Sequence, residues 1–503
     1  MGRTKIVFLN SISGSLSAFV SLICNYILRI AIAKFLGDEI FGINSMFTTI
    51  LITLQIVDVG FGTSIIIHLY KEFVKNDYGI ISEYVSYYKK VYFYIGLFIF
   101  VAGLLLDLFC LSLFINTTVP LIEVQSYFII FLLGVVLKYF TLYKSCVLYA
   151  DQKNRIVTNQ RQLVDVVFLF IQLFFLYSTK SFYLFLLLKG VQDVTANLFI
   201  IRYVNKHYPL IESKTKCRDK EIFGKIITTL KPIAVHRISD TIASSASVII
   251  MGVCNLSIVI VGYYSNYTMI LTAILMLVSQ IGIAFTSSFG NLSASGDKER
   301  VIGVYNKSLN IFLVAAVALS ILFLSSVSDF IAVVFGSGFV LNPMAELMIT
   351  GQLFFTVVAS FLRSIQNATG THYIDLWIMI LQSLLSIVLP IGLFFIWGFN
   401  GILLGGVVPI FVCTVLIKGK RLTELYDESL IRHYILSIIK YLVLIIATSV
   451  IVVIIKKYVV FNNSVVDFIV HSLIGLMMVA LFLFYTYKRD QNVYKSLIKN
   501  LRR

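Results

Sequence analysis

The sequence of 503 residues contains 59% hydrophobic and only 13% charged residues, and its mean hydropathy is +0.92. Soluble proteins carry about 25% charged residues, so this composition excludes an ordinary soluble enzyme and predicts a polytopic membrane protein. The net charge of +16 comes from basic residues dispersed over many short loops, which argues against a nucleic-acid-binding protein.

Apolar runs of about twenty residues, separated by polar segments, predict about 14 transmembrane helices in an all-α fold. The first run is too long for a signal peptide and lacks a small-residue cleavage site, so it is a retained helix. The six cysteines show no CxxC spacing, which indicates neither a metal site nor a disulfide framework. The predicted helices span residues 8–33, 43–70, 91–115, 124–150, 159–178, 182–203, 232–255, 260–288, 304–327, 346–369, 375–396, 401–418, 435–456 and 466–487.

The distribution of lysine and arginine predicts the orientation of these helices. If the N-terminus is cytoplasmic, loops on that side hold about 29 of the 41 basic residues, including those in 71–79, 205–225 and 488–503. The opposite side holds about four, namely Lys34, Lys180, Lys456 and Lys457. The positive-inside rule therefore predicts that both termini lie in the cytoplasm.

An internal repeat appears when the chain is shifted against itself by about 220 residues. Segment 41–64 then lies over segment 261–284 without a gap, and Gly42 meets Gly262. An even number of spans between the copies predicts a parallel repeat, with substrate bound between the halves near the midplane. We expect two six-helix lobes and a final helix pair, divided as lobe 1–205, cytoplasmic linker 206–230, lobe 231–420, and helix pair with basic tail 421–503.

Polar residues recur every four positions along the first predicted helix, at Ser13, Ser17, Ser21, Asn25 and Arg29. One face of this helix is therefore not meant for lipid. The serines can act as helix-packing contacts. A guanidinium in the membrane costs at least about 2.5 kcal/mol, so Arg29, with Asn25, is a candidate ligand for an anionic substrate.

Buried carboxylates are candidates for ion coupling. Gln55, Asp58 and Gly62 fall on one face of the second predicted helix. Asp58 either forms a salt bridge with Lys138 of the fourth helix or takes up and releases a coupling H⁺ or Na⁺. Asp165 is the second candidate for that role.

Two further pairs of opposite charge are spaced for neutralisation within one helix. Lys189 and Asp193 are four residues apart, and Arg237 and Asp240 are three apart. We expect Arg237 to face a cavity, since it lies near the cytoplasmic mouth of the helix that opens the second half.

Lys144 and Arg363 occupy nearly equivalent positions in the two copies of the repeat. They either extend to the cytoplasmic interface or flank a central cavity. Bases outnumber acids among the charges within spans, which favours an anionic guest such as a diphosphate or an acidic sugar. The bases are 29, 138, 144, 189, 237 and 363, and the acids are 58, 165, 193 and 240.

A membrane enzyme is the alternative to a secondary transporter. Glycan polymerases and glycosyltransferases usually carry their chemistry on a long external loop, whereas the longest predicted external loop, 328–345, holds one carboxylate and no histidine. The chain has no GxxxxGK[ST] motif for ATP. A secondary transporter without a cofactor is therefore favoured.

Three stretches carry a family resemblance. Residues 33–73, beginning "AKFLGDEIFGINSMF", residues 148–162, "LYADQKNRIVTNQRQ", and residues 262–297, from "GYYSNYTMIL" to "SSFGNLSASGD", resemble the Wzx-type polysaccharide flippases. These belong to the multidrug, oligosaccharidyl-lipid and polysaccharide exporter superfamily. The resemblance covers nearly the whole chain.

The resemblance implies 12 to 14 helices in two six-helix lobes and an alternating-access mechanism. It implies that an undecaprenyl-diphosphate-linked oligosaccharide moves from the cytoplasmic to the external leaflet of a bacterial inner membrane, for capsule or other envelope glycan synthesis. Ion coupling and contact with glycan polymerases and glycosyltransferases are also implied, and a multidrug exporter of the same superfamily is the alternative. One departure is that residues 245–250 lack an acidic residue found in related sequences.

The sequence thus yields two sets of candidate site residues. The carboxylates expected to couple ion movement are Asp58, Asp240 and Asp165. The residues expected to bind the anionic headgroup are Arg29, Lys138, Lys144, Arg237, Arg363 and Asn25, of which Arg29 and Arg237 also match the family by position.

Overall fold

The computed structural model describes residues 3–58, 60–211, 219–294, 297–461 and 463–489. Their secondary structure is helical, apart from an isolated bridge between Asn116 and Ser257. The described part holds fourteen helices of at least 15 residues, and twelve of its segments are long and apolar enough to cross a membrane. The predicted all-α polytopic fold is confirmed. Cys217 and the basic tail from residue 490 lie outside the described residues.

The chain divides into two compact units, residues 1–262 and 263–503. The predicted repeat and its boundaries at 205, 230 and 420 stay predictions. The first unit contains α1 (Arg3–Leu36), α2 (Asp38–Leu54), η1 (Gln55–Asp58), α3 (Phe61–Lys75), α4 (Tyr78–Phe109), α5 (Leu111–Phe114), α6 (Leu121–Thr141), η2 (Leu142–Lys144), α7 (Ser145–Ala150), α8 (Asn154–Thr179), α9 (Phe182–His207), α10 (Asp219–Val253) and the start of α11 (Ile258–Ala294).

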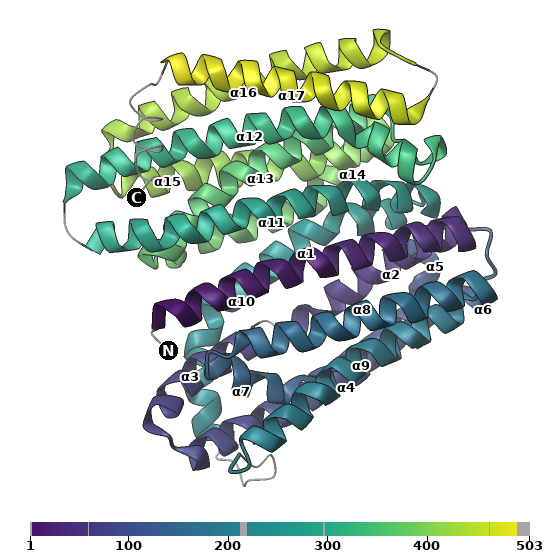
Figure 1. Ribbon diagram of the computed structural model, residues 1–503, viewed down its shortest axis with the longest axis vertical. Coiled ribbons are helices and arrows are strands. Elements are labelled where there is room, and N and C mark those ends of the chain that lie inside the picture. The colour runs from purple at the N-terminus through teal and green to yellow at the C-terminus, as the bar shows by residue number, and fades with distance from the viewer. Residues whose placement is uncertain (1–2, 59, 212–218, 295–296, 462, 490–503) are drawn as a thin grey trace. The chain divides into compact units, whose positions relative to one another are not determined.

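Two pairs of parallel helices build much of the first unit. The helices α1 and α8 run side by side, as do α6 and α9 (Figure 1). Polar side chains join the first pair, because Ser17 Oγ donates to Gln162 Oε1 and Ser21 Oγ donates to Asp165 Oδ2, each at 2.8 Å. Ser17 and Ser21 of the α1 stripe therefore act as helix-packing contacts.

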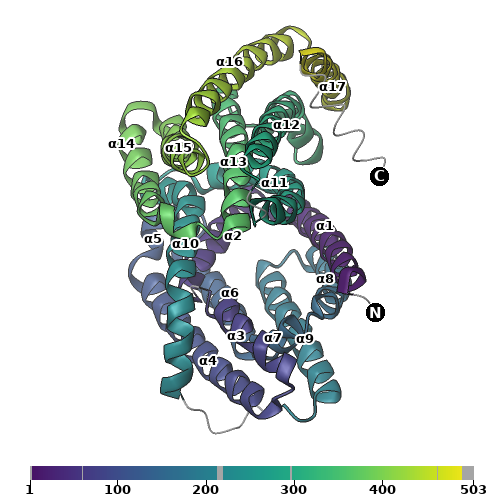
Figure 2. The same cartoon turned by 90° about the vertical axis from the view of Figure 1, so that its left-hand side faces the viewer.

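The second unit continues from α11 and is organised around α12. Figure 2 shows α12 beside α13, and α12 also packs against α16 and α17. The elements are α12 (Lys298–Val334), η3 (Ser337–Phe339), α13 (Pro343–Thr369), η4 (His372–Asp375), α14 (Leu376–Pro409), the π-helix η5 (Ile410–Lys418), α15 (Gly419–Glu424), α16 (Ser429–Tyr458) and α17 (Ser464–Arg489).

Several predicted helices differ from the observed ones in their continuity: those at 91–115 and 124–150 are each divided, into α4 and α5 and into α6, η2 and α7. The second, 43–70, is interrupted by a 3₁₀ turn at Gln55–Asp58. The helices predicted at 375–396 and 401–418 run together as α14, which has non-helical torsion angles at Gly398 (φ 57°) before it passes into η5. Hydropathy cannot detect such breaks, because the interrupted segments remain equally apolar.

Candidate functional site

The break between α2 and α3 places Asp58 at the end of a 3₁₀ turn rather than on a continuous helix. Gly60, which follows it, has φ +88°, and a Cβ there would lie 2.6 Å from Ile233 Cγ2 of α10. Positive φ and close approach both require glycine at this position. The local sequence therefore directs the Asp58 carboxylate away from the regular helix surface.

Asp58 lines a cavity of about 270 Å³ within the first unit. Tyr92 of α4 donates its hydroxyl to Asp58 Oδ1 at 2.7 Å. Arg237 of α10 lines the same cavity and attracts the Asp58 carboxylate electrostatically. The other lining residues are Ile52, Gln55, Ile56, Gly60, Gly62, Thr63, Tyr139 and Thr241.

The size and lining of this cavity restrict what it can hold. Ligand pockets usually measure about 300–1,000 Å³, so 270 Å³ accommodates water and a small ion but not an oligosaccharide. A carboxylate beside a phenol and a guanidinium is suited to exchanging a proton or a cation. Gln55, Asp58 and Gly62, expected to share one face, all line this cavity despite the broken helix.

A second polar group lies among α1, α6, α8 and α9. It comprises Arg29, Lys138 and Lys189 together with Asp165 and Asp193, and we call it the cation cluster. Lys189 is electrostatically coupled to all four of the other members. Three cations face two carboxylates, so the cation cluster carries a surplus positive charge.

The carboxylates of the cation cluster have defined partners. Asp193 Oδ2 lies 3.8 Å from Lys138 Nζ, and these side chains are 38% and 30% exposed. Asp193 thus lies near Lys138 of α6 and also interacts electrostatically with Lys189 of its own helix, as the spacing within α9 suggested. Asp165 accepts hydrogen bonds from Ser21 and from Gln192 Nε2, each at 2.8 Å.

Arg29 is held against α2. Its guanidinium carbon lies 4.8 Å from the centroid of the Phe41 ring, and Nη2 donates to Ser45 Oγ at 3.4 Å. A cation over an aromatic face is worth about 2 kcal/mol when desolvated. This contact positions the charge and still leaves the guanidinium within electrostatic range of Lys189.

A glycine contact brings α6 and α9 close enough to bring Lys138 and Asp193 together. A Cβ on Gly134 would lie 2.9 Å from Gly190 Cα, and a Cβ on Gly190 would lie 3.0 Å from Gly134 Cα. Only residues without side chains permit this approach. One turn along the parallel pair, Lys138 meets Asp193.

Replacing Gly190 by valine is expected to lower the free energy of unfolding by about 1–3 kcal/mol, because the added methyl groups collide with the backbone of α6. The measurement is thermal unfolding in detergent. The control is Gly303→Val on α12, where a Cβ meets nothing within 4 Å. An equal loss in both variants would mean that helix propensity, not the α6–α9 contact, is responsible.

The remaining predicted residues lie in other surroundings. Lys144, in η2, is buried and donates to Asn205 of α9. Asn25 donates to the Ser21 carbonyl oxygen of its own helix at 2.8 Å. Asp240 lies half-buried on α10, and Arg363 is exposed on α13 of the second unit. Within the first unit, the structure therefore groups Arg29, Lys138 and Asp165, and separately Asp58 with Arg237.

Sequence reasoning missed Arg161 of α8. Its Nη2 donates to Asn197 Oδ1 at 2.9 Å, and Asn197 Nδ2 donates in turn to Thr141 Oγ1 at 2.9 Å. Arg161 lies just inside the helix predicted from residue 159, in the stretch 148–162 that carries the family resemblance. The available signal was its spacing of four from Asp165, which puts both on one helix face.

Comparison with known families gives one match. The family model described as "Polysaccharide biosynthesis protein" matches residues 7–286, more than half of the chain. No curated protein sequence matches this chain.

Comparison with solved structures identifies the fold. An inward-facing multidrug resistance MATE family transporter of the MOP superfamily has a TM-score of 0.64 at 16% identity, over 81% of this chain and 96% of that one. The lipid II flippase MurJ in an inward closed conformation also has a TM-score of 0.64, at 15% identity, over 96% and 99% of the two chains. A mutant of the Vibrio cholerae MATE transporter VcmN has a TM-score of 0.56 at 12% identity, over 85% and 96%. The chain therefore has the fold of multi-pass membrane transporters and flippases.

Proposed function

Because this chain belongs to the polysaccharide biosynthesis protein family, we propose that it is a flippase for a polyprenyl-diphosphate-linked oligosaccharide. It moves the glycan from the cytoplasmic to the external leaflet of the bacterial inner membrane by alternating access, with both termini cytoplasmic. The product supplies capsule or other envelope glycan synthesis, where glycosyltransferases act before the flippase and a polymerase acts after it.

The observation that carries this proposal is the surplus of positive charge in the cation cluster. Arg29, Lys138 and Lys189 come from three different helices, and Lys189 interacts electrostatically with the other two. A diphosphate carries several negative charges, and arginine presents a planar fork to such a group while lysine presents a point charge. The partial exposure of Lys138 gives a headgroup access to the cluster.

We assign ion coupling to the cavity of about 270 Å³ beside Asp58, which shares no residue with the cation cluster. Asp58 takes up the coupling H⁺ or Na⁺, and Arg237 competes with that ion for the carboxylate. Asp165 and Asp240 are the alternative coupling residues. Of these, Asp165 already accepts hydrogen bonds from Ser21 and Gln192.

The proposal is tested by flipping of lipid-linked oligosaccharide in proteoliposomes. We expect Arg29→Ala and Lys189→Ala each to reduce translocation by about 10- to 100-fold, the equivalent of one lost charge-assisted hydrogen bond of ~1.5–3 kcal/mol. The matched control is Arg155→Ala, an exposed arginine at the start of α8 in the same unit. Thermal unfolding of each variant separates loss of transport from loss of fold.

The double variant Arg29→Ala/Arg363→Ala decides the cationic binding model. Unchanged translocation in this variant would contradict it. A multidrug exporter instead requires an apolar or acidic pocket for cationic compounds. Transport of a cationic dye that survives both substitutions, without transport of the lipid-linked oligosaccharide, would support that alternative.

A further inference from the structure

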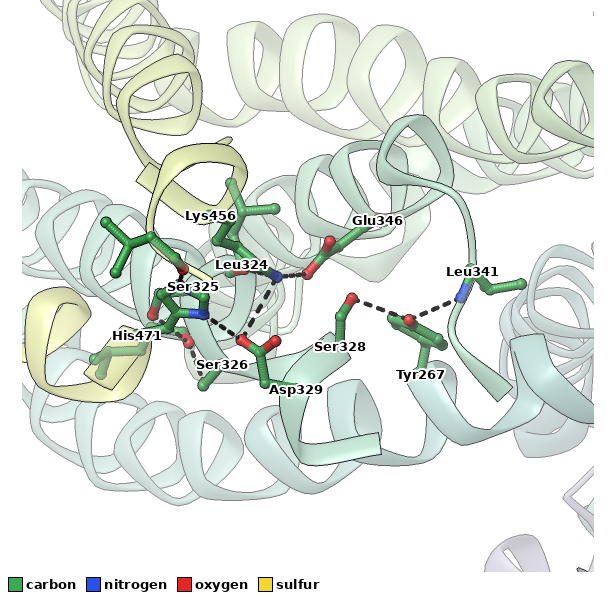
Figure 3. A network of polar contacts seen from close by, with 12 residues as sticks. Tyr267, Leu324, Ser325, Ser326, Ser328, Asp329, Leu341, Glu346, Lys456 and His471 are labelled. Carbon is green, nitrogen blue, oxygen red and sulfur yellow. Dashed lines mark hydrogen bonds and ion pairs between the residues drawn. The ribbon is translucent and has the colours of Figure 1, made fainter. Parts of the chain in front are cut away.

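The second unit contains a cluster of charged side chains from four helices (Figure 3). Lys456 near the end of α16 lies 2.9 Å from Glu346 Oε1 of α13 and 4.0 Å from Asp329 Oδ2 of α12. Its Nζ also donates to the Leu324 carbonyl oxygen at 3.2 Å. Glu346 is almost fully buried, and Lys456 and Asp329 are only 16% and 17% exposed.

His471 of α17 joins this cluster through both ring nitrogens. Nδ1 lies 2.9 Å from Asp329 Oδ2, and Nε2 lies 2.8 Å from the Val459 carbonyl oxygen. The side chain is 4% exposed.

These two contacts fix the number of protons. A backbone carbonyl only accepts, so Nε2 of His471 must carry a hydrogen. The contact between Nδ1 and the carboxylate then needs a second proton, carried by either Nδ1 or Asp329, because otherwise two lone pairs face each other at 2.9 Å. The His471–Asp329 pair therefore holds one proton more than a neutral imidazole and a carboxylate.

Packing between α12 and α17 keeps this contact in place. One turn beyond His471, Gly475 lies so close to Ser325 that any Cβ would collide with its hydroxyl. Ser325 is in turn one helical turn before Asp329. The two helices thus cannot slide without separating the glycine from the serine, and their register places His471 opposite Asp329.

The charges facing His471 balance only when the proton is bound. Lys456 and protonated His471 then oppose Asp329 and Glu346. Asp467, one turn before His471 on α17, is engaged with the backbone N–H of Phe461 at 2.8 Å. Loss of the proton leaves one cation for two carboxylates in a largely buried site, which is strongly unfavourable.

We propose that His471 and Asp329 form a proton-binding site that fastens the α16–α17 pair to α12. The bound proton connects α17 to α12 directly, and the hydrogen bond from Nε2 to Val459 connects the same imidazole to the end of α16. The attachment is strong at low pH, where the proton is bound, and weakens as the pH rises and the proton leaves. This site is independent of the proposed substrate.

Solid-state NMR of ¹⁵N-histidine-labelled protein in lipid bilayers tests the protonation directly. The chain has six histidines, so the His471 signal is assigned by its loss in His471→Gln. At pH 7 we expect the bound proton to appear either as an imidazolium spectrum of His471 or as a carboxylic acid signal of ¹³C-labelled Asp329, and the exposed His433 of α16 serves as the comparison histidine. A neutral His471 beside an ionised Asp329 at pH 6 would overturn the proposal.

Asp329→Asn provides a second test, which distinguishes proton binding by the His471–Asp329 pair from a purely structural contact. Asparagine preserves an acceptor for Nδ1 but removes the carboxylate, so we expect the spectra at pH 7 to lose the signal of the extra proton. An unchanged His471 spectrum in this variant would contradict the assigned partner.

Thermal unfolding measures the attachment itself. We expect His471→Gln to lower the melting temperature at pH 6 and to have a progressively smaller effect toward pH 9, whereas His433→Gln has no pH-dependent effect. A difference that stays constant with pH would contradict the proposal. If His471→Gln does not fold, the histidine signal that changes in Asp329→Asn identifies His471, and the wild-type spectrum still decides.

Discussion

Replacing Lys418 by methionine is expected to lower the free energy of unfolding by about 3–5 kcal/mol, the cost of leaving a buried charge without its partner. Lys418 Nζ, at the end of η5, lies 2.7 Å from Asp375 Oδ2, at the end of η4, and the two side chains are 6% and 1% exposed. Methionine fills a similar volume but cannot neutralise the carboxylate. The loss is measured by steric trapping or by denaturation in mixed micelles.

Two further variants separate charge from packing in this pair. In Lys418→Met/Asp375→Leu both charges are gone, and we expect most of the lost stability to return, since apolar replacements of buried pairs are often neutral. The control Lys420→Met breaks the surface pair with Glu424, whose side chains are 57% and 40% exposed, and should cost at most about 1 kcal/mol. Equal losses at Lys418 and Lys420 would rule out the burial argument.

Replacing Asp58 by asparagine is expected to abolish the dependence of transport on an imposed ion gradient. One coupled charge moving through 100 mV gains ~2.3 kcal/mol, which can drive about fifty-fold accumulation. Asparagine keeps an acceptor for the Tyr92 hydroxyl but cannot exchange a proton or neutralise a cation. The measurement is translocation in proteoliposomes with and without a pH or Na⁺ gradient.

The control for Asp58 is Tyr92→Phe, which removes the hydrogen bond but keeps the carboxylate. We expect this variant to retain gradient dependence. If Asp58→Asn retains it as well, the coupling residue lies elsewhere, and Asp165→Asn and Asp240→Asn are the variants to compare. Loss of transport with and without the gradient would instead indicate a structural role for Asp58.

Hydropathy and helical spacing predicted much of this protein correctly. Lipid requires long apolar helices, so their number and approximate limits follow from composition. Spacing of three or four residues also grouped Gln55, Asp58 and Gly62, which line one cavity. Helix limits and the residues that share a helix face are local properties, so each can be predicted from the sequence of a single helix.

The partners of the charges did not follow from the sequence. The spacing within α9 relates Lys189 to Asp193, but it does not show that Asp193 also lies near Lys138 of another helix. Lys456 was counted among external loop residues, but it contacts Glu346 and Asp329 in the interior. Spacing along a helix limits which residues share a face, but it contains no information about the helix that packs against that face.

The sequence by itself determined that this protein is a helical membrane protein with cationic residues within its spans. The lipid bilayer requires long apolar helices, so a charged residue within such a run is recognisable from the sequence alone. Only the tertiary structure decided which charges meet. Glycine contacts such as Gly134 with Gly190 and Gly475 with Ser325 set the register between helices. A shift of one helix along another by a few ångströms decides whether a buried cation faces a carboxylate or remains available for an anion.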